Sequence, residues 1–211
     1  VTLSNNTAPY GGGMLNYNSS PTLSSVTISN NTATNGAGIY NNISSLTISQ
    51  SKFAGNTAAD AGGAVYNLNA SVKVNNSSIT GNKANWGGAV FKEGGGTDIF
   101  LNCTIAGNYA GSDGGGINTK TSNNTTNLIN TIVYGNTKTA SADASDIRND
   151  DGNATINVNY SSYGAVTGTI AGGNNTNANP IFTNPTLPTS ANTPNTNGDY
   201  SLKPGSPAIG A

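Results

Sequence analysis

The sequence is poor in the residues that carry most enzyme chemistry. Its 211 residues include no histidine, one cysteine and one tryptophan, and only 8% of them are charged. Without histidine, the chain has no Ser-His-Asp or Cys-His catalytic arrangement. The single cysteine, Cys103, excludes an internal disulfide bond and a thiolate metal cluster, and we expect it to be a small buried residue.

Charge and hydrophobicity exclude two further classes. Eight basic residues against nine acidic ones give a net charge of −1, so the chain lacks the basic surface that binding to nucleic acid phosphates requires. It has no apolar run of about 18 residues, so we expect no membrane insertion by this chain. The sequence begins at Val1 without the segments of a signal peptide, and we therefore expect a processed or excised chain.

In place of these features, the sequence has a repeat of about 25 residues. In each repeat an apolar residue is followed three positions later by asparagine. This pattern occurs in Leu3-Ser-Asn-Asn6, Ile28-Ser-Asn-Asn31, Phe53-Ala-Gly-Asn56, Ile79-Thr-Gly-Asn82, Ile105-Ala-Gly-Asn108 and Val133-Tyr-Gly-Asn136. A glycine-rich segment ending in an apolar residue follows each of the first five asparagines, as in Gly63-Ala64-Val65. A third column precedes the asparagines and consists of Leu23, Ile48, Val74, Phe100 and Leu128, with Val158 as its next member.

Three short apolar segments per repeat predict the fold class. They are too short for a pair of helices, and they are rich in β-branched residues. We therefore predict an all-β chain in which each repeat is one coil of a β-solenoid with three inward faces. Equivalent residues would stack from coil to coil at the strand spacing of about 4.8 Å, so thin apolar ladders suffice for a core.

The motifs also resemble those of a known family. Phe53-Ala-Gly-Asn56 followed by Gly62-Gly63-Ala64-Val65 looks like the paired FxxN and GGA[ILV] motifs of polymorphic outer membrane protein repeats. The tail from Asn179 to Ile209 is similar to the closing segment of many secreted bacterial β-helix proteins. The resemblance implies a right-handed parallel β-helix, located outside the cell or on a bacterial surface.

The chain divides into two parts. Residues 1–171 are expected to form the parallel β-helix, with about six to seven coils of 25–28 residues each. Residues 172–211 contain most of the prolines and are expected to form an irregular cap over the terminal coil. The first coil has no such cover, since Leu3 already occupies a core position. The sequence is then either cut from a longer rod, or it stacks end to end on identical subunits and forms filaments.

A column of large side chains directly follows the glycine-rich segments: Leu15, Tyr40, Tyr66 and Phe91. Because side chains alternate along a strand, we expect these rings to point outward as a surface stripe, with Trp86 beside them. Such a stripe binds glycans or another protein chain. The alternative is a ladder that only stabilises its own coils.

An acidic cluster surrounds Arg148 and consists of Asp143, Asp146, Asp150 and Asp151. Carboxylates and loop carbonyls are the ligands that calcium prefers, so these residues are candidates for a structural calcium site. Their spacing matches no known calcium loop, and a solvated acidic loop in which Arg148 pairs with one neighbour is the alternative. We expect no other cofactor.

The most specific functional interpretation is a non-catalytic structural or adhesive module. Its partners would be identical subunits or cell-surface glycans. The alternative is a carbohydrate-binding or carbohydrate-active β-helix, similar to polysaccharide lyases and hydrolases, with Asp98 and Asp113 as its candidate acids. A regular threonine array for ice binding is a further class, but Lys52 and Tyr134 interrupt the outward positions that would form it.

Overall fold

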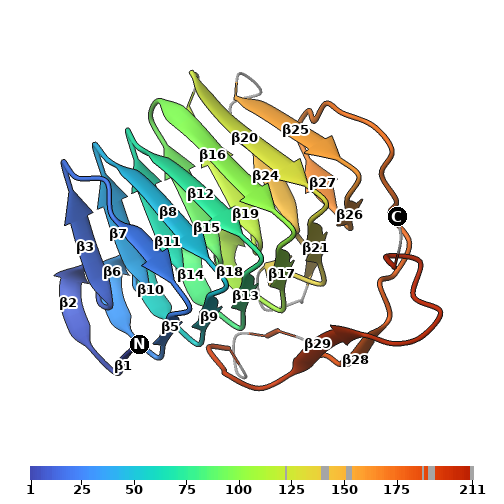
Figure 1. Ribbon diagram of the computed structural model, residues 1–211, viewed down its shortest axis with the longest axis horizontal. Helices are drawn as coiled ribbons and strands as arrows, with labels where there is room; N and C mark the ends of the chain where they lie inside the picture. The colour runs from blue at the N-terminus through green and yellow to red at the C-terminus, as the bar shows by residue number, and fades with distance from the viewer. Residues whose placement is uncertain (122, 139–142, 151–153, 187, 190–192, 210–211) are drawn as a thin grey trace.

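The computed structural model describes residues 1–121, 123–138, 143–150, 154–186, 188–189 and 193–209, without the side chains of residues 143 and 144. This part of the chain forms strands and no α-helix. It therefore contains no helix that is long and apolar enough to cross a membrane. All of these strands except β28 and β29 stack in four sheets, A to D, along one axis (Figure 1). The predicted fold is confirmed, since the chain is a parallel β-helix of about six coils.

Each complete coil contributes one strand to each sheet. Sheet A contains β1 (Thr2–Ser4), β5 (Thr27–Ser29), β9 (Lys52–Ala54), β13 (Ser78–Thr80), β17 (Thr104–Ala106), β21 (Ile132–Tyr134) and β26 (Ser162–Tyr163). Sheet B contains β2 (Thr7–Tyr10), β6 (Thr32–Asn35), β10 (Thr57–Ala61), β14 (Lys83–Trp86), β18 (Tyr109–Asp113), β22 (Thr137–Lys138) and the antiparallel β23 (Asp143–Ala144). Sheet C contains β3 (Met14–Tyr17), β7 (Ile39–Asn42), β11 (Val65–Leu68), β15 (Val90–Glu93), β19 (Ile117–Lys120), β24 (Ile147–Asn149) and β27 (Val166–Thr167). Sheet D contains β4 (Thr22–Ser24), β8 (Ser45–Ser49), β12 (Ser71–Asn75), β16 (Gly96–Leu101), β20 (Asn124–Ile129) and β25 (Thr155–Asn159).

Sheets A, C and D enclose the main core, and their inward residues are those that the repeat predicted. Equivalent residues pair in register, as Ile28 does with Phe53. The buried columns are Ile28, Phe53, Ile79, Ile105 and Val133 in sheet A, Ile39, Val65, Val90, Ile117 and Ile147 in sheet C, and Ile48, Val74, Phe100, Leu128 and Val158 in sheet D. Each coil therefore needs only a few large apolar residues, which explains the low apolar content of the sequence.

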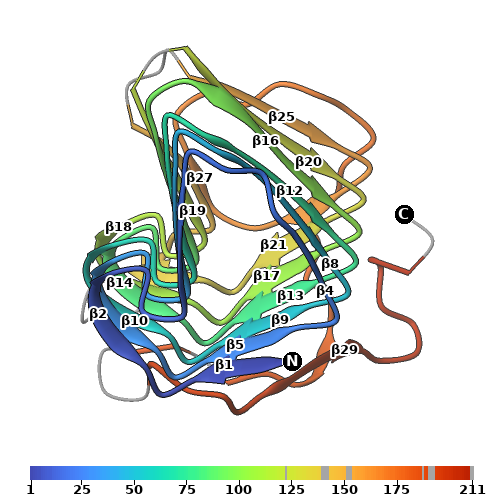
Figure 2. The same cartoon turned by 60° about the vertical axis from the view of Figure 1, so that its left-hand side comes forward.

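Sheet B is a fourth face that the sequence did not predict. Its inward residues Ala33, Ala58 and Ala84 form a small cluster of their own, and β10, β14 and β18 lie at one corner of the coil (Figure 2). The glycine-rich turns from sheet B to sheet C pass very close to the next coil. A Cβ atom on Gly63 would lie 2.2 Å from the carbonyl oxygen of Gly88, so only glycine fits there.

A ladder of asparagines runs from coil to coil between sheets A and B, and it consists of the exposed Asn6 and the fully buried Asn31, Asn56, Asn82, Asn108 and Asn136. At each step the side-chain oxygen accepts the backbone N–H and the side-chain N–H of the asparagine one coil earlier, at 2.8–3.1 Å. The residue before the asparagine has positive φ, 56° at Asn30 and 64° at Gly81, a conformation that asparagine and glycine tolerate best. The ladder thus provides hydrogen-bond acceptors for the backbone N–H groups at this corner.

A second ladder of small polar side chains follows the corner between sheets D and A. The backbone N–H of Ser51 donates to the hydroxyl of Ser77, and that of Cys103 to the hydroxyl of Thr131. Cys103 is only 3% exposed, so its predicted burial is confirmed.

The C-terminal segment differs from the expected lid in where it lies. Residues 171–176 pair with the last coil through bridges at Asn157 and Ser162. Further along the chain, the antiparallel strands β28 (Phe182–Asn184) and β29 (Asp199–Leu202) lie along the outside of sheet A (Figure 1). The backbone N–H of Asn195 donates to the carbonyl of Gly81 at 2.9 Å. Outward residues of sheet A beside this segment are buried, among them Ala54, Thr80 and Ala106, so sheet A offers no open threonine array.

Replacement of Asn82 by alanine tests the asparagine ladder. The side chain is fully buried, donates to two backbone carbonyls and accepts from Asn56. Its loss leaves several buried polar groups without partners, so we expect the free energy of unfolding in urea to fall by on the order of 3 kcal/mol. The control is Asn42→Ala, which changes a half-buried side chain on the outer face of sheet C. An equal loss in both variants would contradict a special role for the ladder.

Candidate functional site

The predicted aromatic column forms a continuous stack on the outside of sheet C. The ring centroids of Tyr40 and Tyr66 are 5.1 Å apart, and those of Tyr66 and Phe91 are 5.2 Å apart. Tyr10 at the end of β2 extends the stack, with its centroid 5.1 Å from that of Tyr40. These four residues, called the aromatic stack below, adopt tilted and edge-to-face arrangements, which aromatic pairs favour.

The expected exposure of the stack is wrong for three of its rings. Tyr40, Tyr66 and Phe91 are only 9%, 8% and 4% exposed. They do lie outside the main core, as alternation along the strand predicts, but Ala61 and Trp86 from sheet B pack against them. The repeat did not predict that residues of sheet B cover these rings. This contact depends on the angle between sheets B and C, which the spacing of residues within one column does not show.

A pocket of about 170 Å³ opens where the stack ends, between sheets B and C. This B–C pocket is lined by the rings of Tyr66, Phe91 and the half-buried Trp86, and by the charged residues Asp60, Glu93, Lys120 and Asp150. The hydroxyl of Tyr66 donates to Oε2 of Glu93 at 2.5 Å. Burial, together with Glu93, raises the pKa of Tyr66 far above its usual value, so the hydroxyl remains a hydrogen-bond donor. The pocket thus combines an apolar wall with acidic and basic groups.

Beyond the pocket, the aromatic column changes into an ion-pair network. Arg148 occupies the register position of Phe91 two coils further on. Its Nη1 lies 2.6 Å from Oδ2 of Asp113, and its Nε donates to Asp150 at 2.6 Å. Lys138 also pairs with Asp113, at 3.2 Å. The guanidinium therefore has carboxylate partners, as the interpretation of a solvated acidic loop expects.

The structure separates the calcium candidates that it describes. Asp146 is buried, and its Oδ1 accepts both hydrogen bonds from Asn136 at 2.7–2.8 Å, which ends the asparagine ladder. Asp150 faces Arg148. The side chain of Asp143 and the whole of Asp151 lie outside the described residues. Within the described part of the chain, no three Asp, Glu, Cys or His residues gather as a metal site would require. Calcium binding stays a prediction.

The two acids of the carbohydrate-active alternative lie on opposite sides of the coil wall. Asp98 is 0% exposed inside the β-helix, where its Oδ1 lies 3.4 Å from Nζ of Lys92. Asp113 belongs to the ion-pair network outside. These carboxylates cannot flank one glycosidic bond. Lys92 is a buried charged residue that was not among the candidates from the sequence, although its place in the column of Asn16, Asn41 and Asn67 signals a buried position.

The repeat itself matches a known family. Residues 25–42 and 50–68 match the Chlamydia polymorphic membrane protein (PMP) repeat. The chain is a PMP-like β-helix repeat protein. Both matched segments run through sheets A, B and C and include a ladder asparagine and a ring of the aromatic stack, so the resemblance carried by Phe53-Ala-Gly-Asn56 is confirmed. No curated protein and no solved structure is similar enough to count as a match.

The buried carboxyl of Asp146 makes a pH dependence testable. Burial raises its pKa from 3.8 to about 6, against the hydrogen bonds from Asn136 and Ala165 that lower it. The folded state therefore binds this proton more tightly than the unfolded chain. Its contribution to stability falls as the pH rises from about 4 to about 6 and is regained on acidification. In Asp146→Asn this group no longer titrates.

We expect the wild type to gain about 1 kcal/mol more stability than Asp146→Asn when the pH is lowered from 7 to 5. Urea unfolding at both pH values measures the difference. The control is Asp60→Asn, because Asp60 is exposed and its replacement should leave the wild-type pH dependence intact. Identical slopes in the wild type and Asp146→Asn would show that Asp146 titrates normally.

Proposed function

We propose that this PMP-like chain is a non-catalytic adhesive module of a bacterial surface protein. The polymorphic membrane proteins whose repeat it carries are surface proteins, which supports a location on the cell surface or outside the cell. The β-helix serves as a rigid support, and the B–C pocket is the surface that it presents. A glycan is the ligand class that fits this pocket best.

The observation that carries the proposal is the pairing of one accessible ring with several charged groups. Trp86 is half-buried, with its indole at the pocket. Sugars bind proteins by placing an apolar face on such a ring while side chains hydrogen-bond the hydroxyl groups. Glu93 and Lys120 supply an acceptor and a donor at the same pocket. Its volume of about 170 Å³ restricts the contact to a small part of a glycan.

Binding to a glycan array, followed by calorimetry with the best ligand, tests this proposal. We expect Trp86→Ala to weaken binding at least about tenfold, because stacking on the ring is lost. The matched control is Tyr17→Ala, since Tyr17 is a 62% exposed aromatic residue of β3 in the first coil and does not line the pocket. Equal affinity of the wild type and Trp86→Ala, or no glycan bound at all, would refute the proposal.

The same ligand distinguishes the carbohydrate-active alternative. If incubation with the protein releases new sugar ends, and Glu93→Gln abolishes this release, the pocket is catalytic rather than adhesive. Glu93 and Asp150 both line the pocket, and they would be the acids to compare.

End-to-end stacking of identical subunits is the second mode of association. In the chain 1–211, β1 to β4 pair with the second coil on one side only, so their other edges accept a further coil of the same polypeptide or of another. We expect negative-stain electron microscopy of this chain to show filaments that lengthen with protein concentration. Short rods of one length at every concentration would contradict stacking.

A further inference from the structure

Lys92 on β15 is a charged residue in the interior of the β-helix. It is 0% exposed and ranks among the largest fully buried side chains of the described residues. In sheet C it pairs in register with Asn67 on β11, which in turn pairs with Asn41 on β7. A buried lysine is costly unless nearby groups match its charge and its hydrogen bonds.

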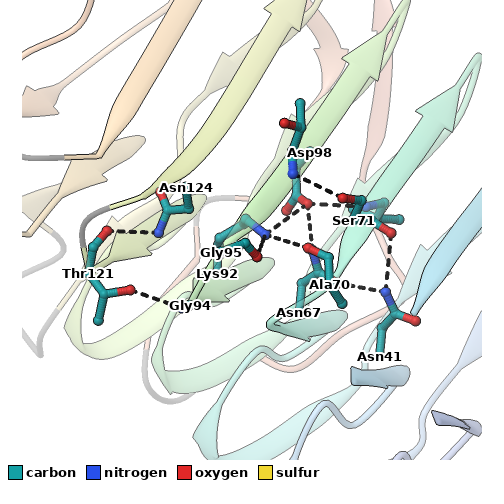
Figure 3. Close-up of polar contacts among 12 residues, drawn as sticks. Asn41, Asn67, Ala70, Ser71, Lys92, Gly94, Gly95, Asp98, Thr121 and Asn124 are labelled. Atoms are coloured by element: carbon teal, nitrogen blue, oxygen red, sulfur yellow. Dashed lines mark hydrogen bonds and ion pairs between the residues drawn. The ribbon is translucent and has the colours of Figure 1, made fainter. Parts of the chain in front are cut away.

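Asp98 on β16 provides the matching charge from sheet D. Its Oδ1 lies close to Nζ of Lys92 (Figure 3), at 3.4 Å. Asp98 is also 0% exposed. Nζ donates to the carbonyl oxygen of Ala70 at 2.6 Å as well. The second carboxylate oxygen of Asp98 has no hydrogen-bond partner among the described residues. The pair is therefore closed off from solvent, and one of its oxygens is free to accept a proton.

The carboxamide of Asn67 shares both acceptors with Lys92. Its Nδ2 donates to Oδ1 of Asp98 at 2.5 Å and to the carbonyl oxygen of Ala70 at 2.9 Å (Figure 3). The ammonium group and the carboxamide nitrogen are thus held next to each other. On its other side, the carbonyl oxygen of Asn67 accepts a hydrogen bond from Nδ2 of Asn41 at 2.6 Å, which polarises the carbonyl and fixes which end of the amide faces Asp98.

We propose that Lys92 and Asn67 become joined by an intramolecular isopeptide bond, with Asp98 as the proton carrier and ammonia as the leaving group. The interior brings together a nucleophile, a polarised amide carbon and a carboxylate that contacts both nitrogens. The bond links β11 to β15, and therefore one coil covalently to the next.

The reaction needs no reagent from outside. Asp98 takes a proton from the ammonium group of Lys92, and the neutral amine attacks Cγ of Asn67 while the amide N–H of Asn41 stabilises the developing negative oxygen. Asp98 moves the proton from the attacking nitrogen to the carboxamide nitrogen. The C–N bond breaks, and ammonia leaves with a proton as ammonium. One ammonium group and one primary amide thus become one secondary amide and one ammonium ion.

Burial favours each of these steps. Desolvation raises the pKa of Asp98 to about 6, despite the neighbouring charge of Lys92 and the hydrogen bonds that lower it. A carboxylate with a raised pKa accepts a proton from an amine more readily. Exclusion of water also protects the amide of Asn67 from hydrolysis, so that the amine is the nucleophile within reach.

Intact mass spectrometry of the purified wild-type chain tests the bond directly. We expect a mass about 17 Da below that of the sequence, which is the mass of one ammonia molecule. Trypsin does not cut after an acylated lysine. The digest should therefore contain a branched peptide that joins residues 53–73 to residues 84–120, and its fragmentation should place the link between Asn67 and Lys92.

Two variants separate the role of Asp98 from that of carboxylates in general. Asp98→Asn keeps the shape of the side chain but cannot carry the proton, so we expect the full sequence mass. Asp113→Asn changes a carboxylate outside the coil and should still lose ammonia. A mass deficit in Asp98→Asn equal to that of the wild type would overturn the assigned role of Asp98.

The mass of the wild-type chain shows whether the bond forms, even if a variant fails to fold. A wild-type chain at its full sequence mass, with normal cleavage after Lys92, overturns the proposal. A deficit of about 18 Da with Lys92 joined to Asp98 also overturns it, because water would have been lost and Asn67 would not be the acyl donor.

Discussion

The buried asparagine ladder is the constraint on which the rest of this β-helix depends. A turn between two short strands leaves backbone N–H groups that no strand can pair, and burying them unpaired would cost about 1–3 kcal/mol each. Here the side chain of the next coil accepts them, as Asn108 does for Asn82. Because this contact works at one register only, every coil lies directly over the last. The aromatic stack and the apolar columns follow from that alignment.

The same alignment explains how much the sequence could predict. In a solenoid, residues one repeat apart are neighbours in space, so Phe53, Asn56 and Gly63 revealed their environments by spacing alone. Contacts between residues of different columns could not be predicted from this spacing. Sheet B was missed because its alanines carry little apolar signal, and the cover that Trp86 provides for Phe91 depends on how two sheets meet. Of the calcium candidates, Asp146 and Asp150 are separated because they lie on either side of β24 and have different partners, Asn136 and Arg148.

Departures from the repeat mark the places where the chain carries charge. In the column of Tyr66 and Phe91, Asn118 and then Arg148 follow the rings, and Arg148 pairs with Asp113 at the end of β18. Asp146 ends the asparagine ladder with an acceptor in place of an amide. In each case a change in one column is compensated by a residue of another element. A single substitution at such a position would leave a buried polar or charged group without its partner, which is costly.

Lys92 and Asp98 are the most buried of these compensating pairs. A covalent link between coils at their position in the β-helix would have a structural role. The next coil carries three buried side-chain oxygens without partners among the described residues, on Thr119, Asn124 and Thr126. The ladder of Asn16, Asn41 and Asn67 thus gives way to a region with fewer satisfied groups. A solenoid is stabilised mainly between neighbouring coils, so its coils separate most easily where those contacts are weakest. A bond from β11 to β15 would hold two neighbouring coils together at the edge of that region, and unfolding that begins beyond it would stop there.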